Sequence, residues 1–424
     1  MTGLLTSVGA EAACQPTWES GVAVPPLFYA DDQGLLASQA TGLQRQLGYL
    51  AEYCATWGLT VNTSKTKVVV YAAAAPRSVG DFHYQGTAVE RAPSFKYLSV
   101  QPHSSHAFCS AGAARAQAGK QAVHILRRRM AQCGLQSHPT LAMSLFDIFV
   151  RPVMSYGVEV WGPQLVVAAL AGRAPDTCEK VHLDFLRRLL GVRDTCCALT
   201  VQAETGRLPI VVGWAQQVAR FVNRLTVLDD SRVAKQAMLD SVALAATGGA
   251  AGSGRLCWAA EVGEMCRLLH QDTSFLRGHL PERMDIGEVA DSAACRHDGR
   301  YSGSSTMVMR YQEEVTGQAV AQAVYRPAAH LSAVPERKRR QTLARLRLGC
   351  SWVADYVGRT QRLTRDQRPC QHCGASLQST GHVLLDCPHY APLRAESPHL
   401  FPEGQTLHGL YAHPDIAAVA RFAL

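Results

Sequence analysis

The chain has 424 residues, of which 47% are hydrophobic and 18% are charged, so it is long enough for two or three domains and too apolar to be globally disordered. It contains neither a run of eighteen apolar residues nor a basic, apolar leader, and we therefore expect no transmembrane helix and no secretion. The net charge is +8, from 42 Lys and Arg residues against 34 Asp and Glu residues, which favours a polyanionic partner.

The first predicted element is a tight β-hairpin in the segment PPLFYADDQGLLA. Two apolar runs, Leu27–Tyr29 and Leu35–Ala37, flank the acidic pair Asp31 and Asp32. Apolar runs separated by a short polar turn are typical of hairpins. We expect the two carboxylates to lie at the turn, at the edge of a sheet that includes residues 66–72.

An amphipathic helix is predicted next, from about Gln39 to Trp57, because apolar residues recur there at steps of three and four. Gly58 follows at the position where helices commonly end. The β-branched run KTKVVVYA predicts a strand at 66–72, and two further short strands are predicted around Gly86. The chain is therefore predicted to be α+β, with a partial antiparallel sheet in residues 1–108.

Helical patterns dominate from about Ser110 onward. Residues 109–245 are predicted to form one helical domain and residues 335–424 another. Between them, 246–334 is predicted to contain a flexible linker and a poorly assigned region. The clearest linker sequence is the Gly/Ala/Ser stretch 246–254, and polar, irregular sequence is expected to about 315. The individual helices are predicted at about 110–130, Pro139–Val150, Thr177–Leu190, 214–245, 257–270, 317–325 and 335–348.

Basic residues gather in clusters along the helical part. One interpretation is a set of solvated helix faces, which is the commoner explanation for any single cluster. The other is contact with phosphates. The candidate nucleic-acid contacts are Arg127, Arg128, Arg129, Arg337, Lys338, Arg339 and Arg340.

Most of the 14 cysteines are scattered singly, which together with the missing leader favours a reducing compartment, the nucleus or cytoplasm. One group is different: Cys370, Cys373, His382 and Cys387 have the spacing C-x2-C-x8-H-x4-C. Three thiolates and one imidazole are a common ligand set for structural Zn²⁺. The alternative is four unrelated residues in a cysteine-rich chain, and His372 and His389 are spare ligand candidates with poorer spacing.

Asp31 and Asp32 have a possible chemical role. Polymerases that use two metal ions need carboxylates packed close together, and Mg²⁺ prefers such oxygen ligands. Adjacent acids at a hairpin turn would present both carboxylates without burying them. Taken alone, however, two adjacent aspartates more often simply mark a turn.

Several segments resemble the reverse transcriptases of non-LTR (LINE-type) retrotransposons. FYADD resembles their Tyr/Phe-x-Asp-Asp motif C, GLTVNTSKTKVVVY resembles the segment that follows it, and SFKYLSV resembles F-x-Y-L-G with Ser99 in place of Gly. FVRPVMSYGVEVWG, CEKVHLDFLRRLLGV and AETGRLPI resemble the thumb and connecting region. RPCQHCGASLQSTGHVLLDCPHY resembles the C-terminal zinc knuckle. The resemblance covers roughly residues 24–225 and 335–395.

The resemblance implies RNA-directed DNA synthesis, with an RNA template and a DNA primer or target as partners. It implies that Asp31 and Asp32 are catalytic ligands of Mg²⁺ and that Tyr29 lies near the primer–template. Lys65 falls in the motif whose lysine is implied to protonate the pyrophosphate leaving group. The alternative for Lys65 is a solvated charge at a strand edge.

Two further patterns of that family are missing from the 30 residues that precede Asp31: the D-x-x-x-A-F/Y-D motif A, which carries the third carboxylate, and Q-G-x-x-x-S-P. We therefore expect a truncated reverse transcriptase that is inactive alone, its missing N-terminal part being a partner. One alternative is a non-catalytic nucleic-acid-binding protein that uses the basic thumb and the knuckle. The other is a helical scaffold with inert motifs.

Overall fold

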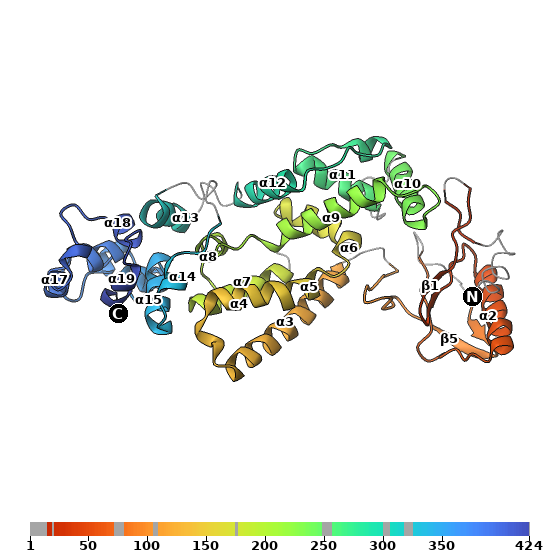
Figure 1. The fold of residues 1–424 in the computed structure, drawn as a ribbon, viewed down its shortest axis with the longest axis horizontal. Helices are drawn as coiled ribbons and strands as arrows, with labels where there is room; N and C mark the ends of the chain where they lie inside the picture. The colour runs from red at the N-terminus through yellow and green to blue at the C-terminus, as the bar shows by residue number, and fades with distance from the viewer. Residues whose placement is uncertain are drawn as a thin grey trace. The chain divides into compact units, whose positions relative to one another are not determined.

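The computed structural model describes residues 15–18, 21–71, 80–104, 109–173, 177–247, 257–299, 306–317 and 325–423 (Figure 1). The chain divides into two compact units, each assembled from three segments. The first unit contains 1–114, 157–171 and 214–289, and the second contains 115–156, 172–213 and 290–424. The fold is mostly helical, with a two-stranded sheet and a separate three-stranded sheet, in agreement with the predicted α+β class.

The first unit holds all the strands of the described residues. Its elements are β1 (Leu27–Tyr29), β2 (Asp32–Gly34), α2 (Ala40–Trp57), β3 (Lys67–Val68), β4 (Phe82–Tyr84), β5 (Thr87–Arg91), α6 (Val158–Leu170), most of α9 (Ile210–Thr226), α10 (Val233–Ala246), α11 (Trp258–Leu268) and the short helix η3 (Ser274–Arg277).

The second unit is helical throughout its described part. Its elements are most of α3 (Cys109–Gln132), η2 (Leu135–Ser137), α4 (Pro139–Phe149), α5 (Arg151–Ser155), α7 (Thr177–Leu190), α8 (Ala198–Thr205), most of α12 (Ile286–Gly299), α13 (Thr306–Tyr311), η4 (Gln312–Thr316), α14 (His330–Ala333), α15 (Arg337–Arg347), α16 (Ala354–Thr360), η6 (Arg365–Gln367), η7 (His382–Asp386), η8 (Pro388–Tyr390), α17 (Ala391–Ala395), η9 (Pro398–Leu400), α18 (Leu407–Tyr411) and α19 (Ile416–Phe422).

The predicted acidic hairpin is confirmed. Strands β1 and β2 pair antiparallel, with Tyr29 opposite Asp32. The prediction that this hairpin shares a sheet with residues 66–72 is wrong, because β1 and β2 form a sheet of their own. The strands are only three residues long, and Pro25 and Pro26, which precede β1, have no N–H to extend its pairing.

Helix α2 also matches its prediction, including its end at Gly58, whose φ of 63° lies in the left-handed region that glycine adopts readily. Its buried face, with Leu47, Leu50 and Cys54, packs on the inward side chains of the neighbouring strands (Figure 1). Phe28 and Leu35 contact this same core, and Gln46 of α2 donates to the Leu36 carbonyl oxygen at 2.9 Å, so packing and a hydrogen bond both attach the hairpin segment to α2.

The three-stranded sheet has the order β3-β5-β4. The predicted pair of strands around Gly86 is confirmed as the antiparallel hairpin β4–β5. Strand β3, however, pairs parallel to β5, so the predicted antiparallel pairing is confirmed for β4–β5 but not for β3. The pairing is also shorter than the predicted 66–72, since only Lys67 and Val68 take part.

Helix packing in the first unit depends on a few close contacts. The rings of Trp161 and Trp214 meet edge-to-face with centroids 5.2 Å apart, so α6 and α9 share a buried aromatic centre. The indole N–H of Trp258 in α11 donates to the Glu159 carbonyl oxygen at 2.9 Å. The side-chain N–H of Asn223 donates to the Met284 carbonyl oxygen at 2.8 Å, and the Met284 N–H donates to the Asn223 side-chain oxygen at 3.0 Å. This pair of hydrogen bonds fixes the segment after η3.

Most of the predicted helices are present. Helix α7 has the predicted bounds, and α3, α4, α9 to α11 and α15 lie in their predicted regions. The expectation of irregular sequence up to about 315 is wrong, because α12 and α13 lie there. Residues 248–254 of the predicted linker and residues 318–324 of the predicted helix lie outside the described residues.

In the described part, no single helix is long and apolar enough to cross a membrane, although the bent pair 139–155 and 158–170 passes that test together.

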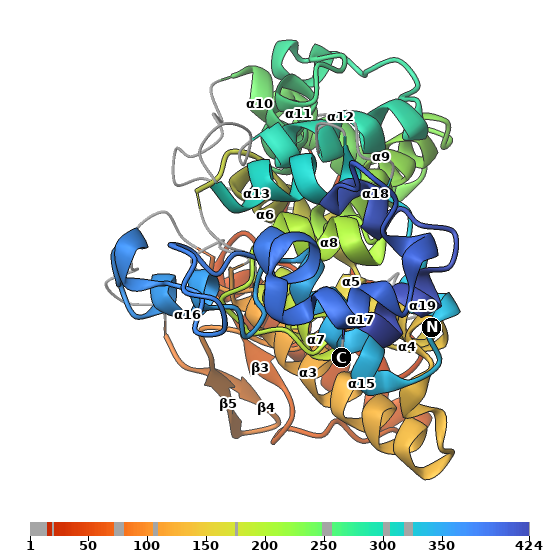
Figure 2. The same cartoon turned by 90° about the vertical axis from the view of Figure 1, so that its left-hand side faces the viewer.

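In the second unit, a buried charged network joins side chains from α8, α13, α14 and α15, of which α8, α13 and α15 are labelled in Figure 2. The fully buried Glu204 carboxylate accepts hydrogen bonds from Tyr311 Oη at 2.6 Å and from Arg347 Nε at 2.6 Å. His330 Nδ1 lies 3.5 Å from Glu204 Oε1. Burial alone would raise the pKa of Glu204, but the charges of Arg347 and His330 and the hydrogen bonds from Arg347 and Tyr311 hold this pKa below its ordinary value.

Stability is expected to fall as the pH decreases from about 6.5 to 4 because of His330. Burial lowers the pKa of His330 to about 4, and the charges of Arg347 and Arg340 add to this against the opposing charge of Glu204. In the unfolded chain His330 has its ordinary pKa near 6.5, so the unfolded chain binds the proton first as the pH falls. The contribution of neutral His330 to the free energy of unfolding is therefore complete above pH 6.5 and lost near pH 4, a change of about 3 kcal/mol.

The measurement is the free energy of urea unfolding at several pH values in this window, for the wild type and for His330→Leu. This variant should lose no hydrogen bond, since neither ring nitrogen of His330 has a hydrogen-bond partner among the residues that the structure describes. The variant should lose most of the decline between pH 6.5 and 5.5, above the range where Glu204, with an ordinary pKa of 4.5, titrates in the unfolded chain. Identical pH profiles for the two proteins would contradict the assignment.

Candidate metal centre and arginine groove

Four side chains predicted from their spacing converge in the second unit. The sulfur atoms of Cys370 and Cys387 lie 3.9 Å apart, and Cys373 Sγ lies 3.2 Å from His382 Nε2. All four ligand atoms lie within 4.8 Å of one another. Zinc bonds of about 2.3 Å to sulfur and 2.0–2.1 Å to nitrogen would place tetrahedral ligands about 3.5–3.8 Å apart. The cluster could therefore hold a metal ion and is compatible with structural zinc.

Short-range backbone bonds build the cluster. The N–H of Cys370 donates to the Ala375 carbonyl oxygen at 2.8 Å, and Gly374 N–H donates back to the Cys370 carbonyl oxygen at 2.9 Å. This tight turn is closed by Gly374 at a φ of 74°, where a side chain would be strained. His382 and Cys387 lie at the start and just after the end of η7, and Cys387 N–H donates to the His382 carbonyl oxygen at 2.7 Å.

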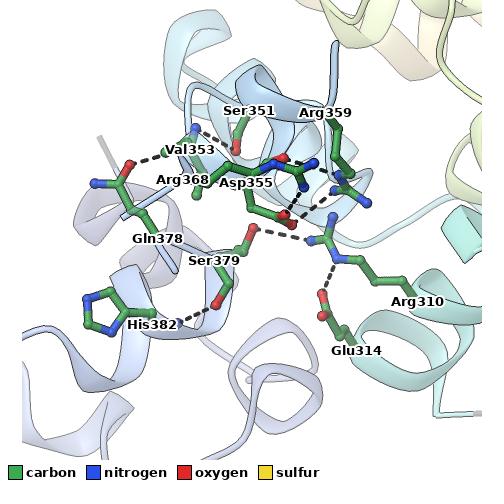
Figure 3. Close-up of polar contacts among 12 residues, drawn as sticks. Arg310, Glu314, Ser351, Val353, Asp355, Arg359, Arg368, Gln378, Ser379 and His382 are labelled. Atoms are coloured by element: carbon green, nitrogen blue, oxygen red, sulfur yellow. Dashed lines mark hydrogen bonds and ion pairs between the residues drawn. The ribbon is translucent and has the colours of Figure 1, made fainter. Parts of the chain in front are cut away.

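Gln378, which is buried, supports the cluster from behind. Its side-chain N–H donates to Cys370 Sγ at 3.7 Å, and its side-chain oxygen accepts from the backbone N–H of Ala354 at 3.0 Å. Its backbone N–H donates to the Arg368 carbonyl oxygen at 2.9 Å, and its carbonyl oxygen accepts from Asp355 N–H at 3.1 Å. Figure 3 shows Gln378 reaching this neighbouring segment. A polar residue within the knuckle thus links it to α16.

An ion pair of Arg368 and a hydrogen bond to Thr380 tie the knuckle to the surrounding helices (Figure 3). The Asp355 carboxylate lies 3.1 Å from Arg368 Nη1 and 3.2 Å from Arg359 Nη2. Arg310 donates to Glu314 Oε2 at 2.6 Å and to the hydroxyl of Thr380 at 3.2 Å. These contacts hold the chain just before the CxxC turn, at Arg368, and just before η7, at Thr380.

The electrostatics of the turn favour a thiolate. Burial would raise the pKa of the Cys370 thiol, but backbone hydrogen bonds from His372 and Cys373, followed by the contacts with His382 and Cys373, lower this pKa to about 6. Because metals bind the thiolate rather than the thiol, this environment prepares Cys370 for a cation.

An open groove of about 540 Å³ in the same unit brings basic side chains together from three helices. Arg127 and Arg128 come from α3, Arg188 from α7, and Arg337 and Arg340 from α15. The remaining lining residues are His124, Met130, Ala131, Ala142, Phe185 and Leu189. We call this the arginine groove. None of the described residues that line it is acidic.

The arginines of the groove affect one another. Burial, followed by the charges of Arg188 and Arg337, lowers the pKa of Arg127. Burial and then Arg337 lower the pKa of Arg340 in the same way. Arg340 is only 4% exposed and donates to the carbonyl oxygens of Val334 at 2.7 Å and Ser137 at 2.9 Å, so its guanidinium holds the backbone together. The other four are exposed, and a bound anion would relieve their repulsion.

The remaining predicted basic contacts do not line the groove. Arg129 Nη1 donates to Gln132 Oε1 at 3.3 Å, Arg339 pairs with Glu336 at 2.7 Å, and Lys338 is exposed. Arg188 was not among the predicted contacts. The sequence feature that could have indicated it is the adjacent pair Arg187 and Arg188. Of these two, Arg187 does not line the groove, because its Nη2 donates to the Cys196 carbonyl oxygen at 2.7 Å.

Among the described residues, no third metal-ligating side chain joins the aspartates that were predicted to be catalytic. Asp31 lies in the hairpin turn, Asp32 begins β2, and Tyr29 is 63% exposed. Lys65 lies in a turn closed by Asn62, and in the described part of the chain it forms no ion pair with either aspartate. Of the residues described, three or more metal-ligating side chains come together only in the group of Cys370, Cys373, His382 and Cys387, which we call the Cys370 cluster. A Mg²⁺ site at the hairpin therefore has no third ligand among the described residues.

No protein-family model, curated protein or solved structure matches this chain. Its function is therefore argued from the metal centre, the arginine groove and the hairpin.

Proposed function

We propose that this chain binds nucleic acid through the arginine groove, as the C-terminal part of a reverse transcriptase that resembles those of non-LTR retrotransposons. The observation that carries the proposal is the convergence of Arg127, Arg128, Arg188 and Arg337 in one groove. Guanidinium groups bind phosphate oxygens in a bidentate manner, and phosphate contacts supply most of the affinity of non-specific nucleic-acid binding.

Convergence favours this function over solvated helix faces. A solvated face spreads its charges into water, whereas burial in the groove, followed by the charges of Arg188 and Arg337, lowers the pKa of Arg127. Such repulsion costs free energy in the unliganded protein. A polyanion removes that cost, and the described lining residues include no acidic side chain that would serve as an internal counter-ion.

The Cys370 cluster completes the proposal with a structural Zn²⁺. Three thiolates and one imidazole prefer zinc to Mg²⁺ or Ca²⁺, which favour oxygen ligands. All four positions of a tetrahedron are filled by side chains, so the metal organises the knuckle and has no open position for catalysis.

The triple variant Arg127→Ala, Arg128→Ala, Arg188→Ala is expected to weaken binding and to flatten its salt dependence. Each lost phosphate contact removes about 0.7–0.9 from the slope of log affinity against log salt, so the slope should fall by about 2–3. The measurement is fluorescence anisotropy of a labelled single-stranded RNA across a salt series.

The matched control is Arg129→Ala, Lys338→Ala, Arg339→Ala, which removes the same number of charges from positions outside the groove. The control should change the slope much less than the groove variant does. Equal slopes for the two triple variants would show that net charge, and not the groove, determines binding.

The 424-residue chain by itself is expected to lack RNA-directed DNA polymerase activity. Two carboxylates without a third hold the catalytic metals poorly. The assay is incorporation of labelled nucleotide on a primed RNA template, with Asp31→Asn as the comparison. Incorporation that this variant abolishes would refute the expectation. Translation of the genomic DNA upstream is a second check, because a continuous frame with the third aspartate would favour an active enzyme.

A further inference from the structure

Two histidines of the knuckle form an exposed aromatic stack that neither the metal cluster nor the arginine groove uses. The imidazole rings of His372 and His389 lie nearly parallel, with centroids 4.4 Å apart and an interplanar angle of 12°. Both side chains are exposed. Tyr390 meets both rings steeply, at 69° to His372 and 81° to His389.

The ring distances show which faces of the stack are open. The Tyr390 centroid lies 5.5 Å from that of His372 and 4.8 Å from that of His389. A ring on top of the stack would lie about twice as far from one imidazole as from the other. Tyr390 therefore lies beside the stack and supports its edges, leaving the outer faces of both imidazoles uncovered by it.

The metal cluster holds the two rings in place. His372 lies between Cys370 and Cys373 in the tight turn, and His389 follows Cys387 by two residues in η8. Pro388 between Cys387 and His389 restricts the backbone there. The two rings thus come from the two segments that carry the metal ligands. A metal bound by those ligands would join the segments and so fix the stack before a nucleic acid binds.

We propose that the His372–His389 stack is a platform on which an unpaired nucleobase stacks. The proposal rests on the proposed nucleic-acid binding and adds to it a preference for single strands. Unstacked bases bind aromatic faces, including those of histidine, and every base has such a face. The arginine groove of the same unit supplies backbone contacts that cannot distinguish single from paired strands, whereas a stacking platform requires a base that has left its duplex.

The test separates base contacts from phosphate contacts. The zinc-loaded full-length chain is titrated with oligothymidylate and with a tetrahydrofuran abasic oligomer of the same length, which has the same phosphates without bases. The wild type should bind the oligomer with bases more tightly, by roughly 5- to 150-fold for each stacked base. His372→Ala with His389→Ala should abolish this difference and leave the salt slope unchanged.

Two further variants make the result specific. His372→Phe with His389→Phe retains aromatic faces and should keep the preference for bases, and His399→Ala removes another exposed histidine of the unit and should also keep it. Zinc content is measured throughout, and His389→Ala alone replaces the double variant if the latter loses zinc. A preference that survives the alanine changes, or that is lost equally in the phenylalanine variant, overturns the platform.

The same titrations distinguish this proposal from the proposed function. Equal binding of both oligomers by the wild type, with a steep salt slope, would overturn the platform and leave the groove intact. Binding of neither oligomer would overturn both.

Discussion

Cys373→Ser is expected to lose the bound zinc, whereas the wild type should contain about one zinc ion per chain. Cys373 is the most informative of the four ligands because its side chain is exposed, while Cys370 and Cys387 are buried. Serine in its place therefore removes a thiolate with little loss of packing. Structural zinc contributes about 10–16 kcal/mol of apparent binding free energy in small peptides, and the segment it organises has little core of its own.

The measurements are zinc content by elemental analysis and limited proteolysis between residues 368 and 390. Cleavage there should become faster in Cys373→Ser, while the hairpin core around α2 remains protected, because that core lies in the other unit. Cys133→Ser is the matched control, since Cys133 is exposed and outside the cluster. Zinc retained in Cys373→Ser, or lost equally in the control, would contradict the ligand assignment.

Glu204→Ala is expected to destabilise the second unit by about 3–5 kcal/mol, which is the cost of leaving one partner of a buried ion pair without the other. The carboxylate is fully buried, and Arg347, with a side chain only 10% exposed, donates to both of its oxygens, at 2.6 and 3.1 Å. Tyr311 would lose its acceptor as well. A loss of this size is a large share of the roughly 5–15 kcal/mol by which domains are stable.

Urea unfolding, followed by far-ultraviolet circular dichroism, measures this loss. Glu336→Ala is the control, because it breaks the half-exposed pair with Arg339 in the same unit and should cost at most about 1 kcal/mol. The double change Glu204→Met with Arg347→Met should recover part of the stability, since it removes both buried charges. Equal losses in Glu204→Ala and Glu336→Ala would show that the buried network contributes no more than a surface pair.

Local patterns in the sequence determined the elements near the candidate sites. Apolar residues at helical steps followed by Gly58 predicted α2, and a short acidic turn between apolar runs predicted the hairpin that carries Asp31 and Asp32. The spacing of Cys370 and His382 with their partners predicted the converging ligands. Each of these features is set by interactions between residues close along the chain, which periodicity and spacing record directly.

Tertiary structure alone decided which distant residues meet. Arg127, Arg188 and Arg337 belong to three helices, and only the packing of α3, α7 and α15 makes their charges one groove and assigns the neighbouring Arg340 a structural role. In the sequence Glu204 is indistinguishable from an ordinary polar residue, yet in the structure it is fully buried and pairs with Arg347. Charge and exposure of such residues depend on side chains more than a hundred positions away, and a periodic pattern within one helix contains no information about them.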